Sequence, residues 1–145
     1  MGLTPDKFTE IDVRHYDFDP NATTATEIAR IDMRDFRKFL VSFFRTIGTG
    51  QITLEIIAAD AVTGGNVAVI ATRTLTTTAD AVGDYAFLQT DAERVRQKGV
   101  DDGYEYRWVS ARVTAATGTD EGVVTYVLGD LREQADGKPA DHYST

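Results

Sequence analysis

Residues 51–58 alternate between apolar and polar side chains, and this alternation predicts a β-strand with one buried face. Immediately upstream, residues 36–47 read FRKFLVSFFRTI, with apolar side chains on both faces. This run predicts a central strand that is covered on both sides, although a buried helix is the rival interpretation. Gly48 and Gly50 separate the two segments, so we expect them to form a β-hairpin.

Further strands are predicted where β-branched and aromatic residues lie between turn signals. Residues 91–98 (DAERVRQK) differ, because Asp91 is a candidate N-cap and Gly99 a candidate stop, so one or two helical turns are expected there. Strands spaced roughly ten residues apart, with one short helix, predict an all-β fold of the β-sandwich or jelly-roll type. The additional predicted strands are residues 67–75, 84–89, 104–115 and 123–128.

The chain divides into three parts in this interpretation. Residues 1–26 show no persistent helical or strand period and are expected to form an extended N-terminal arm. Residues 27–129 contain the predicted strands and form the sandwich domain. Residues 130–145 are polar and contain Pro139, so they are expected to be a flexible C-terminal tail.

Composition excludes several classes of function. The absence of cysteine rules out disulfides, zinc–thiolate sites, iron–sulfur clusters and thiol nucleophiles. A formal net charge of −8 disfavours binding through phosphate neutralisation, so nucleic acid is not expected as a partner. The sequence contains no apolar run that could span a membrane, and residues 1–10 lack the segments of a signal peptide. We therefore expect a protein that is made and kept inside the cell, with no membrane partner.

The sequence also lacks a recognisable catalytic constellation. His15 and His142 are its only histidines, both lie in the predicted loose ends, and no G-x-S-x-G elbow is present. Asp17 and Asp19 are not followed by the glycine and glutamate that complete a calcium loop, and residues 101–103 (DDG) are ordinary turn residues. We predict that the protein is not an enzyme and has no catalytic residue, no metal ligand and no cofactor.

Charged and aromatic residues indicate candidate interface positions. Residues 1–27 carry six acidic side chains against two basic ones, whereas basic residues crowd around the first predicted strands. This opposition suggests an arm that crosses to a neighbouring subunit or host surface, although two solvated faces would give the same pattern. Three aromatic residues on one face of strand 104–115 suggest an interface or a carbohydrate platform, or else part of the core. The candidate interface residues are Arg30, Arg34, Arg37, Lys38, Tyr104, Tyr106 and Trp108.

Residues 31–130 resemble small virion proteins of tailed bacteriophages. The two segments concerned are IDMRDFRKFLVSFFRTIGTGQITLEIIAA and, further on, YEYRWVSARVTAATGTDEGVVTYVLGD. They are similar to proteins in which a D-M lead-in, a hydrophobic strand, a Gly-rich turn and an I-T-L strand recur. The shared motif is a β-pattern rather than a chemical signature, and it does not extend to the arm. The resemblance implies a β-sandwich or jelly-roll protein of the phage head, and most specifically a capsid decoration (cement) protein.

The resemblance also implies partners and a location. A decoration protein would bind the outer capsid shell, bridge neighbouring major capsid subunits and associate with itself, as a homotrimer. It would be made in the cytoplasm of the host bacterium and reside on the capsid surface of the virion. The alternatives are a head-completion or tail protein of the phage, and a β-sandwich module that binds carbohydrate or a host surface through Tyr104, Tyr106 and Trp108.

Overall fold

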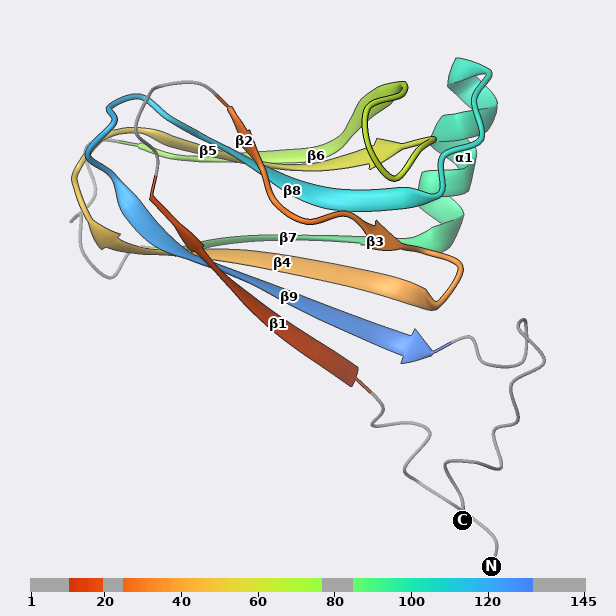
Figure 1. Ribbon diagram of the computed structural model, residues 1–145, viewed down its shortest axis with the longest axis horizontal. Helices are drawn as coiled ribbons and strands as arrows, with labels where there is room; N and C mark the ends of the chain where they lie inside the picture. The colour runs from red at the N-terminus through yellow and green to blue at the C-terminus, as the bar shows by residue number, and fades with distance from the viewer. Residues whose placement is uncertain (1–10, 20–24, 77–84, 132–145) are drawn as a thin grey trace, which may run out of the picture.

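The computed structural model describes residues 11–19, 25–76 and 85–131. Two antiparallel β-sheets face each other, and the one helix of the described residues stands across an end of the sandwich (Figure 1). Sheet A has the strand order β1-β9-β4-β7, and sheet B has the order β2-β8-β5-β6, with β3 also pairing with β8. The predicted all-β sandwich with one short helix is confirmed. The elements are β1 (Ile11–Phe18), β2 (Thr26–Glu27), β3 (Ile31–Asp32), β4 (Phe36–Ile47), β5 (Ile52–Ala59), β6 (Val67–Leu75), β7 (Tyr85–Asp91), α1 (Ala92–Asp102), β8 (Trp108–Ala115) and β9 (Glu121–Leu131).

Inward-facing side chains of both sheets fill the core. In β4 the buried residues Phe39, Val41 and Phe43 alternate with more exposed ones, as the period of a strand requires, so the helix alternative for this segment is wrong. In β5, Leu54 and Ile56 are fully buried from the opposite sheet. Burial of apolar surface contributes about 25 cal/mol per Å², and these positions therefore hold the two sheets together.

Tyr126 of β9 reaches across this core. Its ring centroid lies 4.8 Å from that of Phe39 and 5.0 Å from that of Tyr16. Its hydroxyl accepts a hydrogen bond from the Ala111 backbone N–H of sheet B at 2.8 Å and donates one to the Ala29 carbonyl oxygen at 3.0 Å. Burial raises the pKa of this hydroxyl above its ordinary value. Tyr126 thus links the two sheets through both apolar and polar contacts.

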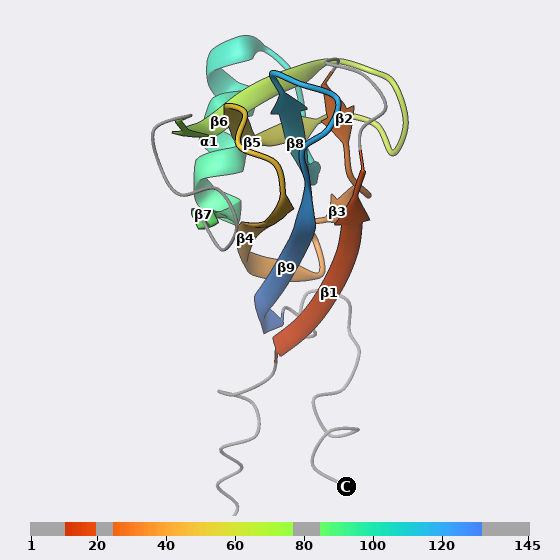
Figure 2. The same ribbon diagram turned by 90° about the vertical axis from the view of Figure 1, so that its left-hand side faces the viewer.

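The predicted hairpin between residues 36–47 and 51–58 is wrong, because β4 lies in sheet A and β5 in sheet B. The connection at residues 48–51 crosses from one sheet to the other, and the connection between β8 and β9 crosses in the same way. Figure 2 looks at the end of the sandwich where both crossings lie. Alternation of apolar and polar residues identifies a strand with one buried face. Two consecutive strands show the same alternation whether they pair in one sheet or lie in different sheets. Instead, β5 forms its local hairpin with β6.

The predicted N-terminal arm needs a correction over the residues that the structure describes. Residues 11–18 form β1, an edge strand of sheet A that pairs with β9 from Ile11 opposite Gly129 to Phe18 opposite Gly122. The physical reason is that Phe18 turns inward and packs edge-on against Phe43, with ring centroids 5.7 Å apart. At the other end of the domain, β9 runs through Leu131, slightly beyond the predicted boundary at 129. Residues 1–10, 20–24 and 132–145 lie outside the described residues, which leaves the rest of the arm and most of the tail as predictions.

Helix α1 begins where the sequence predicts and ends later. Asp91 is the N-cap, and its side chain accepts a hydrogen bond from the Arg94 backbone N–H at 2.8 Å. Gly99 is not the stop, because the helix continues to Asp102 and ends at Gly103, whose φ is 80°. A Cβ at Gly99 would lie 2.4 Å from the Tyr104 carbonyl oxygen. The lack of a side chain at this glycine therefore allows the chain after the helix to pass close to it. The predicted strand over 104–115 is correspondingly shorter and begins at Trp108.

A buried ion pair joins the β4–β5 and β8–β9 connections, both of which cross from one sheet to the other. Arg45, at the end of β4, donates from Nη1 to Asp120 Oδ1 at 2.6 Å, and its side chain is 1% exposed against 0% for Asp120. Arg45 Nη2 also donates to the Gly50 carbonyl oxygen at 2.7 Å, and the Gly50 N–H donates to Asp120 Oδ1 at 3.0 Å. The second carboxylate oxygen, Oδ2, accepts from Thr117 Oγ1 at 2.6 Å. One carboxylate therefore satisfies donors from β4 and from both crossings.

Gly48 allows this arrangement. Its φ is +103°, a conformation that favours glycine. A Cβ at position 48 would lie 2.0 Å from Asp120 Oδ1, so a side chain there would displace the carboxylate.

Removing either partner of the ion pair leaves a charge buried without its counterion. We expect Asp120→Ala to lower the free energy of unfolding by about 3–5 kcal/mol, because that is the usual cost of breaking a buried pair. Urea unfolding followed by Trp108 fluorescence measures the loss. The matched control is Glu93→Ala, which removes an exposed ion pair with Arg96 and should leave the unfolding midpoint nearly unchanged. Equal effects of the two substitutions would contradict the role given to Asp120.

Candidate interaction surfaces

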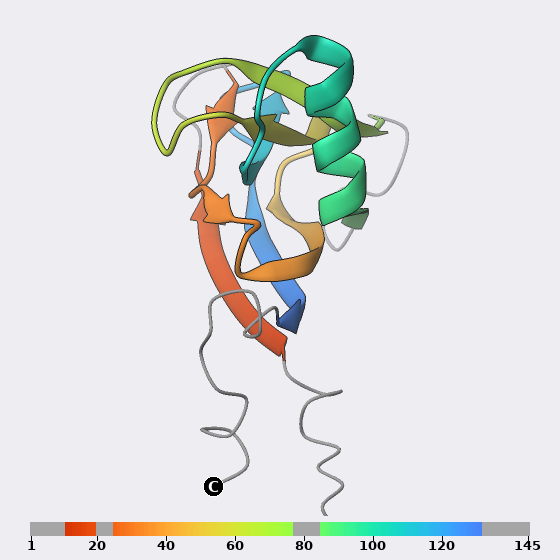
Figure 3. The ribbon, with the colours of Figure 1, turned by 90° about the vertical axis from the view of Figure 1, so that its right-hand side faces the viewer.

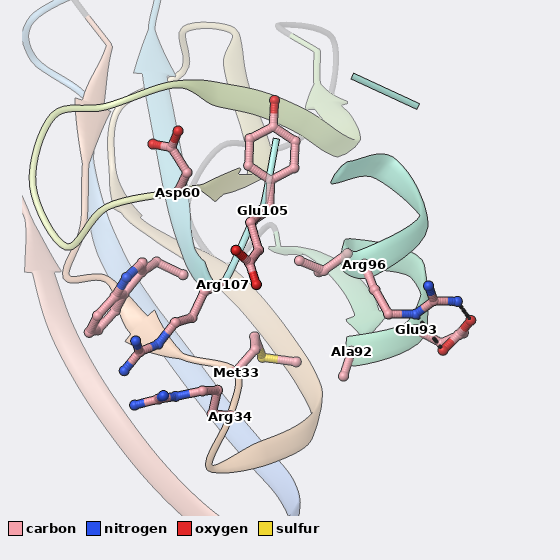
Figure 4. A pocket seen from close by; sticks show the side chains of 11 residues that line it. Met33, Arg34, Asp60, Ala92, Glu93, Arg96, Glu105 and Arg107 are labelled. Atoms are coloured by element: carbon pink, nitrogen blue, oxygen red, sulfur yellow. Dashed lines mark hydrogen bonds and ion pairs between the residues drawn. The ribbon is translucent and has the colours of Figure 1, made fainter. Parts of the chain in front are cut away.

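A pocket of about 760 Å³ opens at the helix end of the sandwich, the end shown in Figure 3. Figure 4 shows that its walls come from α1, from the segment that leads into β8, and from the turn after β3. Three arginines and three carboxylates surround an apolar floor. The lining residues are Met33, Arg34, Asp60, Ala92, Glu93, Val95, Arg96, Glu105, Tyr106, Arg107 and Trp108.

Asp32 organises one wall of this helix-end pocket. Arg107 donates to it twice, from Nε to Oδ1 at 3.0 Å and from Nη2 to Oδ2 at 2.6 Å, and the Arg34 backbone N–H donates to Oδ1 at 2.9 Å. The Arg107 guanidinium carbon also lies 5.0 Å from the Trp108 ring centroid, in a cation–π contact. Burial opposes ionisation of Asp32, but the hydrogen bonds and the positive charge of Arg107 outweigh it, so its pKa lies below the ordinary value.

The predicted aromatic face over residues 104–108 is not formed as expected. Trp108 lies in β8, whereas Tyr104 and Tyr106 precede the strand. Tyr106 is buried at 8% exposure, and its hydroxyl donates to Asp102 Oδ2 at 2.9 Å. Burial and this neighbouring carboxylate raise the pKa of Tyr106 to about 12. Tyr106 thus contributes to packing around α1, and among these rings Tyr104 is the exposed one.

The basic candidate residues separate into three places. Arg34 lines the helix-end pocket, with Nε 3.6 Å from Asp32 Oδ2. Arg37 and Lys38 line a neighbouring hollow of about 380 Å³, which shares Ala92 and Glu93 with the pocket.

Arg30 lies elsewhere and has a structural role. It donates to the carbonyl oxygens of Ala61 and Gly64 at 2.6 and 2.8 Å, and it forms an ion pair with Glu27. The hydrogen bond from Arg30 lowers the pKa of Glu27 against the opposing effect of burial. Arg30 therefore holds the turn between β5 and β6 against β2.

The pocket brings together Arg34, Tyr106 and Trp108 from the sequence prediction and adds Arg96 and Arg107, which the sequence analysis missed. Arg107 stands between two of the predicted residues in the sequence, so its position was a usable signal. The sequence carries no such signal for Arg96, because only the packing of α1 places this residue at the pocket. In the described part of the chain, no cluster of three or more histidine, cysteine or acidic residues could hold a metal ion.

The outer face of sheet A is a second surface, which the sequence analysis did not identify. Four large apolar residues there are conspicuously exposed: Tyr85 at 65%, Ile11 at 59%, Phe44 at 47% and Phe87 at 46%. Strand register joins the aromatic members into one group, because Phe44 lies between Val123 and Tyr85 and Phe87 follows Tyr85 on the same face of β7. Ile11 lies at the opposite corner of the face, beyond the polar side chains of His15, Thr125 and Ser42. Lys38, Asp91 and Asp17 lie at the ends of the strands, and the rows between them carry no acidic side chain. The face consists of Ile11, Val13, His15 and Asp17 of β1, Val123, Thr125, Val127 and Gly129 of β9, Lys38, Leu40, Ser42 and Phe44 of β4, and Tyr85, Phe87, Gln89 and Asp91 of β7.

A signal for this face was present in the sequence. In residues 36–47 the apolar residues at even positions, Leu40 and Phe44, interrupt the polar half of the alternation, and this pattern predicts a strand that is covered on both sides. The structure leaves that second side uncovered by any described residue.

No helix among the described residues has the length and apolar character needed to cross a membrane. No family model matches the chain, and no curated protein sequence matches it. Its fold, however, has counterparts among solved structures.

A structure of Bacillus endospore appendages, a family of disulfide-linked pili, matches with a TM-score of 0.50 and 14% identity over 82% of this chain and 84% of that chain. The PBSX exported protein XepA matches with a TM-score of 0.54 and 12% identity, over 89% of this chain but 40% of that chain. The SPBc2 prophage-derived protein YomS matches at 0.46 with 15% identity, over 83% of this chain and 96% of that chain. At such identities these likenesses concern the fold.

The pairing of Asp32 with Arg107 predicts a pH-dependent contribution to stability. Because the folded-state pKa of Asp32 lies below the ordinary value of 3.8, its contribution is complete above that pH and is lost as the pH falls through the folded-state pKa. Asp32→Asn should therefore destabilise the protein at pH 7, and the difference from the wild type should shrink at about pH 2. Urea unfolding at the two pH values measures this, and a difference that stays constant would contradict it.

Proposed function

We propose that this chain is a non-enzymatic structural protein of a phage virion, and specifically a decoration protein that binds the outer capsid shell. The observation that carries the proposal is the outer face of sheet A. Soluble monomers rarely expose a contiguous apolar patch of large side chains, and such patches mark sites of protein–protein contact. The aromatic members Phe44, Tyr85 and Phe87 are of the kind that anchor interfaces.

The comparisons support a structural role without specifying it. The fold is shared with a pilus protein and with an exported protein of PBSX, at TM-scores of 0.50 and 0.54. The resemblance of residues 31–130 to small tailed-phage virion proteins points in the same direction. Fold alone does not define function, so the specific role rests on the surface described above.

In this proposal the partner is the major capsid protein. The exposed aromatic side chains of the outer face supply contact area, and the charges of Lys38, Asp91 and Asp17 at the ends of its strands select orientation. A protein that binds only the assembled shell stabilises it by mass action, because it adds binding free energy to that state alone. The expected homotrimer would bridge neighbouring subunits of the shell by presenting three such faces at once.

The carbohydrate-binding alternative receives less support from the geometry. A platform for a sugar ring requires several aromatic rings exposed on one face. Tyr106 is buried, and the Arg107 guanidinium lies over the ring of Trp108. The platform of three rings is therefore not presented to solvent.

The decoration proposal predicts that the protein binds capsids and stabilises them. Added to capsids of the source phage prepared without it, the purified protein should cosediment with them and raise their melting temperature. Phe44→Glu should weaken binding by about tenfold or more, because it places a charge between Val123 and Tyr85 in the aromatic group of the face. The matched control is Val100→Glu on α1, which also replaces an exposed apolar residue by glutamate and should bind normally. Circular dichroism checks that both variants fold.

Absence of binding by the wild-type protein would contradict the decoration proposal. Equal binding by Phe44→Glu and Val100→Glu would contradict the choice of surface. The homotrimer has its own test: light scattering on the purified protein should give three times the chain mass of 15.9 kDa, or a whole multiple of that mass.

A further inference from the structure

The sheet edges of this sandwich are not equally protected. An exposed edge presents unpaired backbone N–H and C=O groups to any strand that can reach it. The edge strands β6 and β7 lie beside each other, with the Arg73 guanidinium carbon 5.9 Å from the Phe87 ring centroid, so they cover one side of the sandwich. On the other side, β2 and β3 are two residues each and form a broken edge. Such short strands are one way in which proteins blunt an edge.

Among the described edge strands, β1 is the long one that is neither covered nor broken. Figure 2 shows it at the edge of sheet A, next to β9. It spans eight residues, IDVRHYDF, and contains no proline, glycine or lysine to interrupt pairing. Ile11 and Val13 point outward from the sheet and are exposed, at 59% and 44%. No described residue pairs with the free side of this strand.

The charges of β1 are self-complementary. Asp12 and Arg14 lie on the same side of the strand, where Arg14 donates from Nε and Nη2 to Asp12 Oδ2 at 3.0 and 2.8 Å. In an antiparallel pair of two β1 strands with a twofold axis at Val13, each Asp12 lies opposite the other copy's Arg14. A shift of the axis to Arg14 would bring two guanidinium groups together, and a shift to Asp12 would bring two carboxylates together. Opposite charges directly across an antiparallel pair are favourable and like charges unfavourable, so charge selects the register at Val13.

We propose that β1 of one copy pairs antiparallel with β1 of a second copy about this axis. The contact joins two copies of sheet A into one continuous sheet in the order β7-β4-β9-β1-β1-β9-β4-β7. Both outer faces of sheet A then lie on the same side, and the two Val13 side chains meet between them. The pairing therefore enlarges the apolar face without covering it. It would link two copies, or two trimers, and it does not depend on a role in a virion.

The absence of cysteine from the chain allows a direct test. Directly opposed residues in an antiparallel pair have Cα atoms about 4.5 or 5.5 Å apart, and both distances permit a disulfide. Val13→Cys should therefore form a covalent dimer under mild oxidation, measured as a band on non-reducing gels. The matched control is Val67→Cys, because Val67 begins β6 and is equally exposed at 43%. We expect Val13→Cys to cross-link about tenfold faster than Val67→Cys, because pairing raises the effective thiol concentration.

Charge reversal in the Val13→Cys protein tests the register. Asp12→Arg alone and Arg14→Asp alone each place two like-charge pairs across the axis, and each should slow cross-linking by roughly fivefold. The double variant Asp12→Arg with Arg14→Asp restores both opposite-charge pairs and should restore the rate.

Two results would overturn the proposal. One is cross-linking of Val13→Cys no faster than that of Val67→Cys. The other is a double variant as slow as the single ones. Because the test uses purified protein without capsids, its failure would leave the decoration proposal standing, and failure of capsid binding would leave this one standing.

Discussion

The buried ion pair between Arg45 and Asp120 is the contact on which the two-sheet arrangement depends. Each of the crossings at this end carries a strand out of one sheet and into the other, and a crossing exposes backbone groups that no sheet ladder satisfies. Asp120 accepts from Arg45, from the Gly50 N–H and from the Thr117 hydroxyl, so one carboxylate satisfies donors on both crossings. A buried charge is tolerated only when it is paired and hydrogen-bonded in this way. Loss of either partner would therefore leave a charge buried without its counterion at the junction of the two sheets.

Once the two sheets are held together, the surfaces that remain determine what the protein can do. The helix end carries a charged pocket organised by Asp32 and Arg107. The outer face of sheet A exposes large apolar side chains, and β1 gives that sheet a long edge. A molecule with an open sheet face and an open edge is suited to contact with other proteins. The proposed decoration role and the proposed β1 pairing use these two features separately, yet they are compatible, because edge pairing leaves the face accessible.

Local sequence signals predicted the elements well and their connections poorly. The strands at 36–47, 51–58 and 67–75 and the N-cap at Asp91 all follow from periodicity and capping chemistry. The hairpin between the first two strands was wrong, because a crossing between sheets produces the same alternation. The segment 11–18 is predicted to belong to an arm because residues 1–26 show no persistent helical or strand period, yet Phe18 is almost completely buried. In the helix-end pocket the sequence indicated Arg34 and Trp108, but not Arg96, which only the packing of α1 brings there.

The amino-acid sequence by itself determined that this is an all-β sandwich without cysteine chemistry, because alternation, turn residues and composition are local properties of the chain. It also placed Asp12 and Arg14 two residues apart, which puts them on one side of any strand that contains them. Only the tertiary structure decided which strands share a sheet, that no described residue covers the outer face of sheet A, and that none pairs with the second side of β1. The physical reason is that strand pairing and burial depend on contacts between residues far apart in sequence. Arg45 and Asp120 are separated by 75 positions, and nothing local to either residue specifies the other.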